Sequence, residues 1–290
     1  MFDGFTVDDV PVGDATLHVR VGGDAGGEPL VLLHGHPRTG ATWHRVAPLL
    51  ASRGFRVVVP DLRGYGRSIA PAPRPDHSQA SKRAMAEDVL ALMRSLGHET
   101  FRLVGHDRGS YAAFRLAMDH PEAVRSVALL DCLPIVEHLD RITPEFATEW
   151  FHWFFFAQPE TPERVITADP DAWYGGDPDA MGPENFAERR EAVHRPEVVR
   201  AMLEDYRAGL TIDRADEEAD RAAGRRLQPP LLVLWSLRDD LERLFGDPLT
   251  IWRDWADDVR GHGIESGHHV AEEAPDALAD ALIGFFRGVM

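Results

Sequence analysis

The chain has almost no cysteine, since Cys132 is the only one among its 290 residues. An intrachain disulfide is therefore excluded, and a reducing compartment, by default the cytoplasm, is expected. The sequence also lacks any apolar run near the ~20 residues that cross a bilayer. Its first residues show neither the basic region nor the apolar core of a secretion signal. We therefore expect no membrane partner.

Basic residues are scarce as well, with 31 Lys and Arg against 48 Asp and Glu, which gives a net charge of −17. A role in nucleic-acid binding has no electrostatic support from this balance. The histidine pairs at 34/36 and 268/269 lack further ligands at metal spacing, so the sequence predicts no metal and no cofactor. A small-molecule substrate is the expected partner.

One motif stands out against these absences. The apolar stretch Leu103-Val104 runs into Gly105-His106-Asp107-Arg108-Gly109, which has the form of a nucleophile elbow, a strained turn between a strand and a helix. The raised residue is Asp107, where many hydrolases have serine. An aspartate is already an anion at neutral pH, so it can displace a leaving group from an sp3 carbon or open an epoxide. A lone match could still be an ordinary glycine-rich turn.

The wider pattern predicts an α/β fold. Strand-like and helix-like segments alternate as far as residue 131, which indicates a mostly parallel sheet wound on both faces. The alternation stops over residues 133–225, where the sequence is helix-like and rich in aromatic residues, and a strand pattern resumes at 230–235. We therefore predict a core of residues 1–132 and 226–290 with a helical cap, 133–225, that buries the site and excludes water.

Several segments together resemble one family. The order of candidate nucleophile, acid and histidine along the chain is that of α/β-hydrolases. In particular, the chain resembles the haloacetate (fluoroacetate) dehalogenases, and more distantly the haloalkane dehalogenases and epoxide hydrolases. The matching segments are His34 to Thr39, Trp43 to Pro48, Gly105 to Gly109, Leu130-Asp131, His152-Trp153, Ala157 to Pro159, Glu204 to Gly209 and Glu265 to His268.

The resemblance implies a role for each site residue. Asp107 would be the nucleophile, His268 the base that activates water, and Asp131 the acid that orients His268. Asp239, four residues after Trp235, is the alternate acid, because some relatives place theirs there. Arg108 would hold a substrate carboxylate, and the backbone N–H of His36 would face the reacting centre. His152, Trp153 and Tyr206 would form a halide pocket, although buried aromatic residues often serve packing alone. A homodimer is also implied.

One departure concerns the substrate. Tyr111 stands where the fluoroacetate-active relatives have a second arginine, and a phenol cannot clamp a carboxylate bidentately. Binding of a small haloacetate is expected to be weaker, or the substrate larger or uncharged. The leading hypothesis is cofactor-free hydrolytic dehalogenation of 2-halo carboxylic acids. The alternatives are an epoxide hydrolase in which His152 and Tyr206 donate protons, and a non-catalytic ligand-binding protein.

Overall fold

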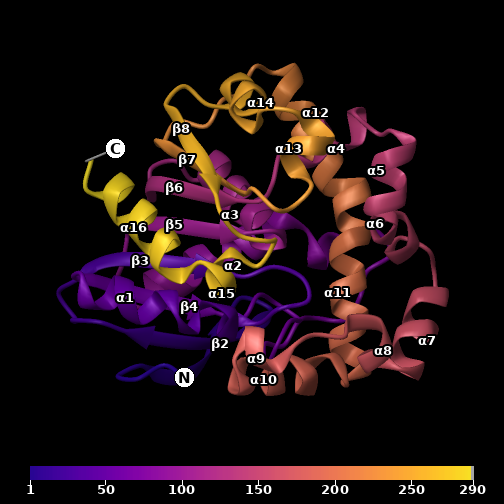
Figure 1. Ribbon diagram of the computed structural model, residues 1–290, viewed down its shortest axis with the longest axis horizontal. Helices are drawn as coiled ribbons and strands as arrows, with labels where there is room; N and C mark the ends of the chain where they lie inside the picture. Colours follow the sequence, from indigo (N-terminus) through magenta and orange to yellow (C-terminus); the bar gives the residue numbers. More distant parts are fainter. Residues whose placement is uncertain (289–290) are drawn as a thin grey trace.

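Eight strands form one sheet in the order β1-β2-β4-β3-β5-β6-β7-β8 in the computed structural model, which describes residues 1–288 (Figure 1). Neighbouring strands from β4 to β8 run parallel, whereas β1 and β2 are antiparallel to their neighbours. The predicted mostly parallel sheet is therefore confirmed. The strands are β1 Thr6–Val12, β2 Ala15–Gly22, β3 Glu28–Leu33, β4 Phe55–Pro60, β5 Phe101–His106, β6 Val124–Leu130, β7 Leu231–Ser236 and β8 Val259–Ile264.

The two faces of the sheet are both covered, as the apolar strands require. In β3, Leu30 and Leu32 belong to the apolar cluster under α1 and α16, whereas Val31 and Leu33 belong to the cluster under α2 and α3. The helices of the sheet region are η1 Gly40–His44, α1 Val46–Ser52, η2 Ser78–Ala80, α2 Lys82–Ser95, α3 Arg108–Asp119, α13 Leu241–Phe245, α14 Pro248–Trp255, α15 Val270–Glu273 and α16 Pro275–Phe286.

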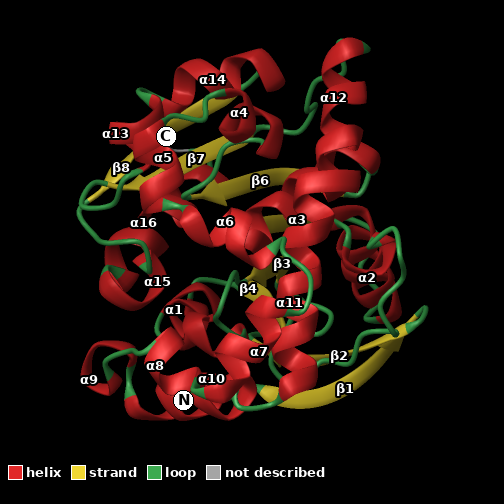
Figure 2. Cartoon of the chain, turned by 90° about the vertical axis from the view of Figure 1, so that its right-hand side faces the viewer, coloured by secondary structure: helices red, strands yellow, loops and turns green. Residues whose placement is uncertain are grey.

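All the helices between β6 and β7 fall inside the segment 133–225. In Figure 1 most of them form the right-hand side of the molecule, beyond the ends of β5 and β6. Figure 2 views the chain from that side, with α6, α7 and α11 in front of the sheet. These helices are α4 Ile135–Asp140, α5 Pro144–Glu149, α6 Phe151–Phe156, α7 Thr161–Ala168, α8 Pro170–Tyr174, α9 Pro178–Met181, α10 Pro183–Val193, α11 Pro196–Ala208, η3 Gly209–Asp213 and α12 Arg214–Ala222.

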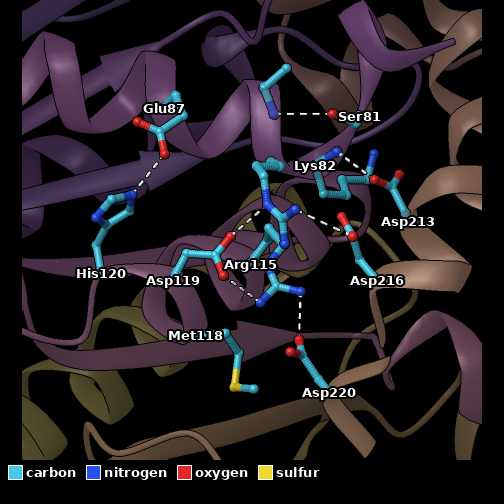
Figure 3. Close-up of polar contacts among 12 residues, drawn as sticks. Ser81, Lys82, Glu87, Arg115, Met118, Asp119, His120, Asp213, Asp216 and Asp220 are labelled. Atoms are coloured by element: carbon cyan, nitrogen blue, oxygen red, sulfur yellow. Dashed lines mark hydrogen bonds and ion pairs between the residues drawn. The ribbon is translucent and has the colours of Figure 1, made fainter. Parts of the chain in front are cut away.

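Helices α11 and α12 are joined without a loop by η3, a π-helical turn. Such turns insert one extra residue per turn and often occur at functional sites. Here the turn begins three residues after Tyr206 and ends at Asp213, and both of these residues contact the sheet region. Ion pairs also join α2 and α3 to α12, as Figure 3 shows for Arg115 and Asp220.

Within residues 1–288, no helix has both the length and the apolar character that crossing a bilayer requires.

Candidate active site

The turn between β5 and α3 holds Asp107 in a conformation that few residues other than glycine adopt, with φ 50° and ψ −121°. Two glycines make this turn sterically feasible. A Cβ atom on Gly105 would lie 2.4 Å from the carbonyl oxygen of Gly109, and one on Gly109 would lie 2.4 Å from that of His34. The sequence pattern thus places a strained carboxylate at the end of a central strand.

The carboxylate of Asp107 receives a backbone hydrogen bond from the loop after β3. The N–H of His36 donates to Asp107 Oδ1 over 2.6 Å, so this amide faces the carboxylate. Burial alone would raise the pKa of Asp107. The positive potential of His268, His106 and Arg108 outweighs burial and lowers the pKa below its ordinary value. Asp107 is therefore an anion at neutral pH.

His268 lies in the loop after β8 and faces two carboxylates. Its Nδ1 is 2.8 Å from Asp239 Oδ2, a hydrogen bond, and 3.8 Å from Asp131 Oδ2. In this geometry Asp239, the alternate acid, hydrogen-bonds to the imidazole, and Asp131, the first choice from the sequence, lies beside it without a hydrogen bond to it. Asp131 has a different set of partners, because both of its oxygens accept hydrogen bonds from Ser236, one from the backbone N–H and one from the hydroxyl.

The pKa of His268 is displaced strongly. Burial would lower it, but the hydrogen bond to Asp239 and the negative charges of Asp131, Asp107 and Asp239 raise the pKa to about 10. The imidazole is therefore a cation at neutral pH for as long as Asp107 keeps its charge. Any change that neutralises Asp107 removes part of this field and brings the pKa of His268 down.

Two inserted helices bring neutral donors to the same place. His152 and Trp153 lie on α6 and Tyr206 on α11, and the Tyr206 ring centroid is 5.8 Å from that of His152 and 6.2 Å from that of Trp153. Burial lowers the pKa of His152 to about 4 and holds the pKa of Tyr206 well above its usual value. Over the described part of the chain, none of these three side chains has a hydrogen-bond partner, so their N–H and O–H groups are free to donate.

Arg108 is placed differently from its predicted role. Its Nε and Nη2 atoms donate to the carboxylate of Asp205 on α11, at 3.2 and 2.7 Å, and Nη2 also donates to the Asp205 carbonyl oxygen. The guanidinium fork that would clamp a substrate carboxylate is therefore already engaged, and Nη1 alone has no partner. No sequence pattern predicts this pair, because the two residues are 97 positions apart.

The rings that surround the Arg108 guanidinium belong to the site. Its central carbon lies 4.2 Å from the Tyr206 ring centroid, 5.2 Å from that of Tyr111 and 5.6 Å from that of Trp153. Tyr111 is only 3% exposed, and its ring packs edge-on against Trp153. Tyr111, predicted to contact substrate, therefore forms part of the wall of the site.

Two groups of possible cation ligands occur where the sequence predicted none. The ligand atoms of His106, His268 and His269 lie within 4.8 Å of one another, and so do those of Asp131, Asp239 and His268. The sequence pattern missed the first group because His106 comes from β5, 162 positions before His268. Both groups share His268, whose raised pKa means that a proton competes with any cation there.

Comparison with known proteins gives matches along nearly the whole chain. The family model described as the alpha/beta hydrolase fold matches residues 28–275. A fluoroacetate dehalogenase from Burkholderia sp is 40% identical and covers 98% of this chain and 95% of its own length. A soluble epoxide hydrolase from Corynebacterium sp. (strain C12) is 32% identical, with 90% of each chain covered. A provisionally assigned alpha/beta hydrolase from Nostoc sp PCC 7120 superposes with a TM-score of 0.94 at 41% identity, covering 99% of both chains.

Proposed function

This chain belongs to the α/β-hydrolase superfamily and is a hydrolase, and we propose that it cleaves the carbon–halogen bond of small 2-halo carboxylic acids through an ester on Asp107. The observation that carries the proposal is the ionised carboxylate at the crest of the β5–α3 turn, opposite a histidine held by Asp239. The 40% identity to a fluoroacetate dehalogenase supports the same reaction class.

In the first step, a carboxylate oxygen of Asp107 attacks the carbon that bears the halogen. A carbon–oxygen ester bond forms, and the carbon–halogen bond breaks with both electrons leaving on the halide. The unpartnered donors of His152, Trp153 and Tyr206 would solvate that halide. This matters most for fluoride, because a strongly hydrated leaving ion needs aimed donors to replace its water. We assign the segment 133–225 as the cap that brings these donors over the strand ends.

In the second step, His268 takes a proton from water, and the resulting hydroxide attacks the carbonyl carbon of the Asp107 ester. The His36 N–H, already hydrogen-bonded to Asp107 Oδ1, would stabilise the oxyanion that forms. Collapse of that intermediate breaks the acyl carbon–oxygen bond, and His268 returns its proton to the departing alkoxide, which becomes the 2-hydroxy acid. Asp107 is left as the carboxylic acid and regains its charge by losing that proton to solvent. The first step prepares the second, since esterification neutralises Asp107 and thereby lowers the pKa of His268 from about 10.

The proposal is tested by halide release together with intact-mass spectrometry. Asp107→Asn should release no fluoride or chloride, because the nucleophilic anion is gone. His268→Ala should release halide once and then carry the added mass of the substrate's carboxyalkyl group, esterified to Asp107. His262→Ala, which changes an exposed histidine on β8, is the matched control and should turn over normally. Normal multiple turnover by His268→Ala without an adduct would overturn the proposal.

Isotope labelling identifies the attacked bond. Several turnovers in heavy-oxygen water should place the heavy isotope in the Asp107 side chain, because the ester is opened at its acyl carbon. A general-base mechanism without an ester would leave that peptide light while labelled product accumulates.

Epoxide hydrolysis is the second candidate, and one observation favours it. The guanidinium of Arg108 is bonded to Asp205, and Tyr111 offers only a neutral phenol. An uncharged substrate would therefore leave no guanidinium without its carboxylate partner. The 32% identical soluble epoxide hydrolase is consistent with this reading. Asp107 would open the ring while His152 and Tyr206 donate to its oxygen. Diol formation from small epoxides without halide release from haloacids would establish this activity in place of the first.

A further inference from the structure

A buried group of charges lies directly behind Arg108. Asp205 is fully enclosed, and besides Arg108 it accepts a hydrogen bond from the Tyr65 hydroxyl over 2.6 Å and pairs with the ammonium of Lys82. Lys82 begins α2, Tyr65 follows β4, and Asp205 lies on α11, so the group joins the sheet region to the inserted helices. One carboxylate therefore faces two cations.

Lys82 is the only lysine in a sequence that contains 31 Lys and Arg residues together. Its side chain is also only 2% exposed, whereas lysine is among the residue types most rarely buried. A buried ammonium needs compensation, and Asp205 supplies it. A lysine retained at this one enclosed position, in a chain that uses arginine everywhere else, indicates a specific electrostatic role.

The role of Lys82 follows from the net charge that Arg108 and Asp205 would have without it. Arg108 and Asp205 alone form a neutral pair, which has little attraction for an anion. With Lys82 on the same carboxylate, the negative charge of Asp205 is shared between two cations. Arg108 then keeps part of its positive charge uncompensated, beside Asp107 and the rings of the site. The unpartnered Nη1 is the atom through which that charge can act.

The other charged group beside Lys82 is Asp213, at the end of η3. It accepts a hydrogen bond from the backbone N–H of Lys82 over 2.8 Å, as drawn in Figure 3. In the described chain Asp213 has no hydrogen bond to Arg108, and Asp205 is the carboxylate that contacts the guanidinium. Asp205 is therefore the group through which Lys82 acts on Arg108.

We propose that Lys82 is a positioning residue for substrate choice, which neutralises Asp205 so that Arg108 Nη1 can attract the carboxylate of a 2-halo acid. This inference rests on the proposed dehalogenase function. It also explains how a chain with a net charge of −17 could receive an anion with one arginine where relatives of the resembled family have two. Lys82 itself touches no reacting atom.

The test compares two substrates that differ in charge and hardly in shape, chloroacetate and chloroacetamide. Lys82→Met should lower the ratio of kcat/KM for chloroacetate to kcat/KM for chloroacetamide at least tenfold, mainly through KM. Asp205→Asn should shift the same ratio in the opposite direction, because it frees the charge of Arg108. A purely structural role would lower turnover of both substrates together and leave the ratio unchanged.

Two further results separate the possible failures. Because the chain has a single lysine, a ¹³Cε-lysine label gives one side-chain NMR signal, which should be that of a charged ammonium at pH 7.5. A neutral amine there, or an unchanged substrate ratio in Lys82→Met and Asp205→Asn, overturns the inference while leaving dehalogenation intact. If the wild-type protein releases chloride from neither compound, the proposed function fails, and the inference fails with it.

Discussion

The site has two parts that differ in charge. The residues at the strand ends are ionised, whereas those on the helices between β6 and β7 are neutral. Asp107, Asp239 and His268 are ionised at neutral pH. His268 lowers the pKa of both carboxylates, and both carboxylates raise the pKa of His268. His152 and Tyr206 are neutral there, because burial keeps the first unprotonated and the second protonated. The strand ends therefore provide the groups that make and break bonds, and the helices provide donors that bring no charge of their own.

This difference has a physical use in the proposed reaction. A cation beside the leaving halide would bind the ion tightly and slow its release, whereas neutral N–H and O–H donors stabilise the developing charge without forming an ion pair. The ionised residues of the strand ends depend on one another's charge, and their charges change one after another during the reaction. Esterification of Asp107 is the event that lowers the pKa of His268.

The largest effect among the ionised residues is expected for Asp239→Asn. Without the carboxylate at 2.8 Å, the imidazole loses its orientation and its compensating charge, so ester hydrolysis should slow by about 10³–10⁴-fold. The Asp107 ester should then accumulate and be visible by intact mass. Asp131→Asn serves as the matched change, since Asp131 bonds to Ser236 and should cost only about tenfold. A larger loss in Asp131→Asn would restore Asp131 as the principal acid.

The neutral part is tested by Tyr206→Phe, which removes a donor and keeps the ring. Fluoride release should fall by about 10²–10³-fold, and chloride release by only about tenfold, because the smaller ion depends more on donated hydrogen bonds. Halide-specific rates on fluoroacetate and chloroacetate measure the split. Tyr174→Phe, which changes a half-buried tyrosine whose hydroxyl also has no partner, is the control. Equal losses for both halides would mean that Tyr206 only packs.

The two chemical steps should also differ in their dependence on pH. Alkylation needs only the Asp107 anion, whose pKa lies below its ordinary value, so kcat/KM should be flat from about pH 5 to 9. Ester hydrolysis needs neutral His268, so kcat should rise with pH by up to about tenfold per unit below the pKa of the ester form. That pKa must be lower than about 10, because Asp107 is no longer charged. A kcat that falls across this range would contradict the assignment of His268 as base.

The smallest expected effect concerns stability in the inserted helices. Glu217 on α12 accepts a hydrogen bond from the Val136 N–H over 2.8 Å, and burial raises its pKa to about 8. A raised carboxyl pKa favours folding at low pH, and this advantage is lost as pH rises from the ordinary value of 4.5 through about 8. Glu217→Gln should match wild type at pH 5 and gain about 1–3 kcal/mol at pH 9 by urea unfolding.

A matched variant keeps this prediction specific. Glu218→Gln changes the exposed neighbour, which pairs with Arg214, and should alter stability by less than about 0.5 kcal/mol at either pH. Equal gains in both variants would indicate a general effect of lowering the net negative charge.

The choice between two candidate acids marks where sequence reasoning stopped. Asp131 follows β6 and Asp239 follows β7, and these two strands are parallel neighbours, so both carboxylates were bound to lie near one another. Which carboxylate bonds to His268 depends on Ser236, because its backbone N–H and its hydroxyl donate hydrogen bonds to both oxygens of Asp131. No local sequence pattern predicts the contact between Ser236 and Asp131, because the two residues are 105 positions apart.

The amino-acid pattern by itself determined the mostly parallel sheet and the strained turn at Asp107. These features depend on alternation, glycine sterics and short loops, which act between near neighbours in the chain. Only the tertiary structure decided that Asp205 engages Arg108 and that Lys82 shares the same carboxylate, 97 and 123 positions away. Electrostatic pairing is set by distance in space and by exclusion of water, and neither exists until the helices have packed on the sheet.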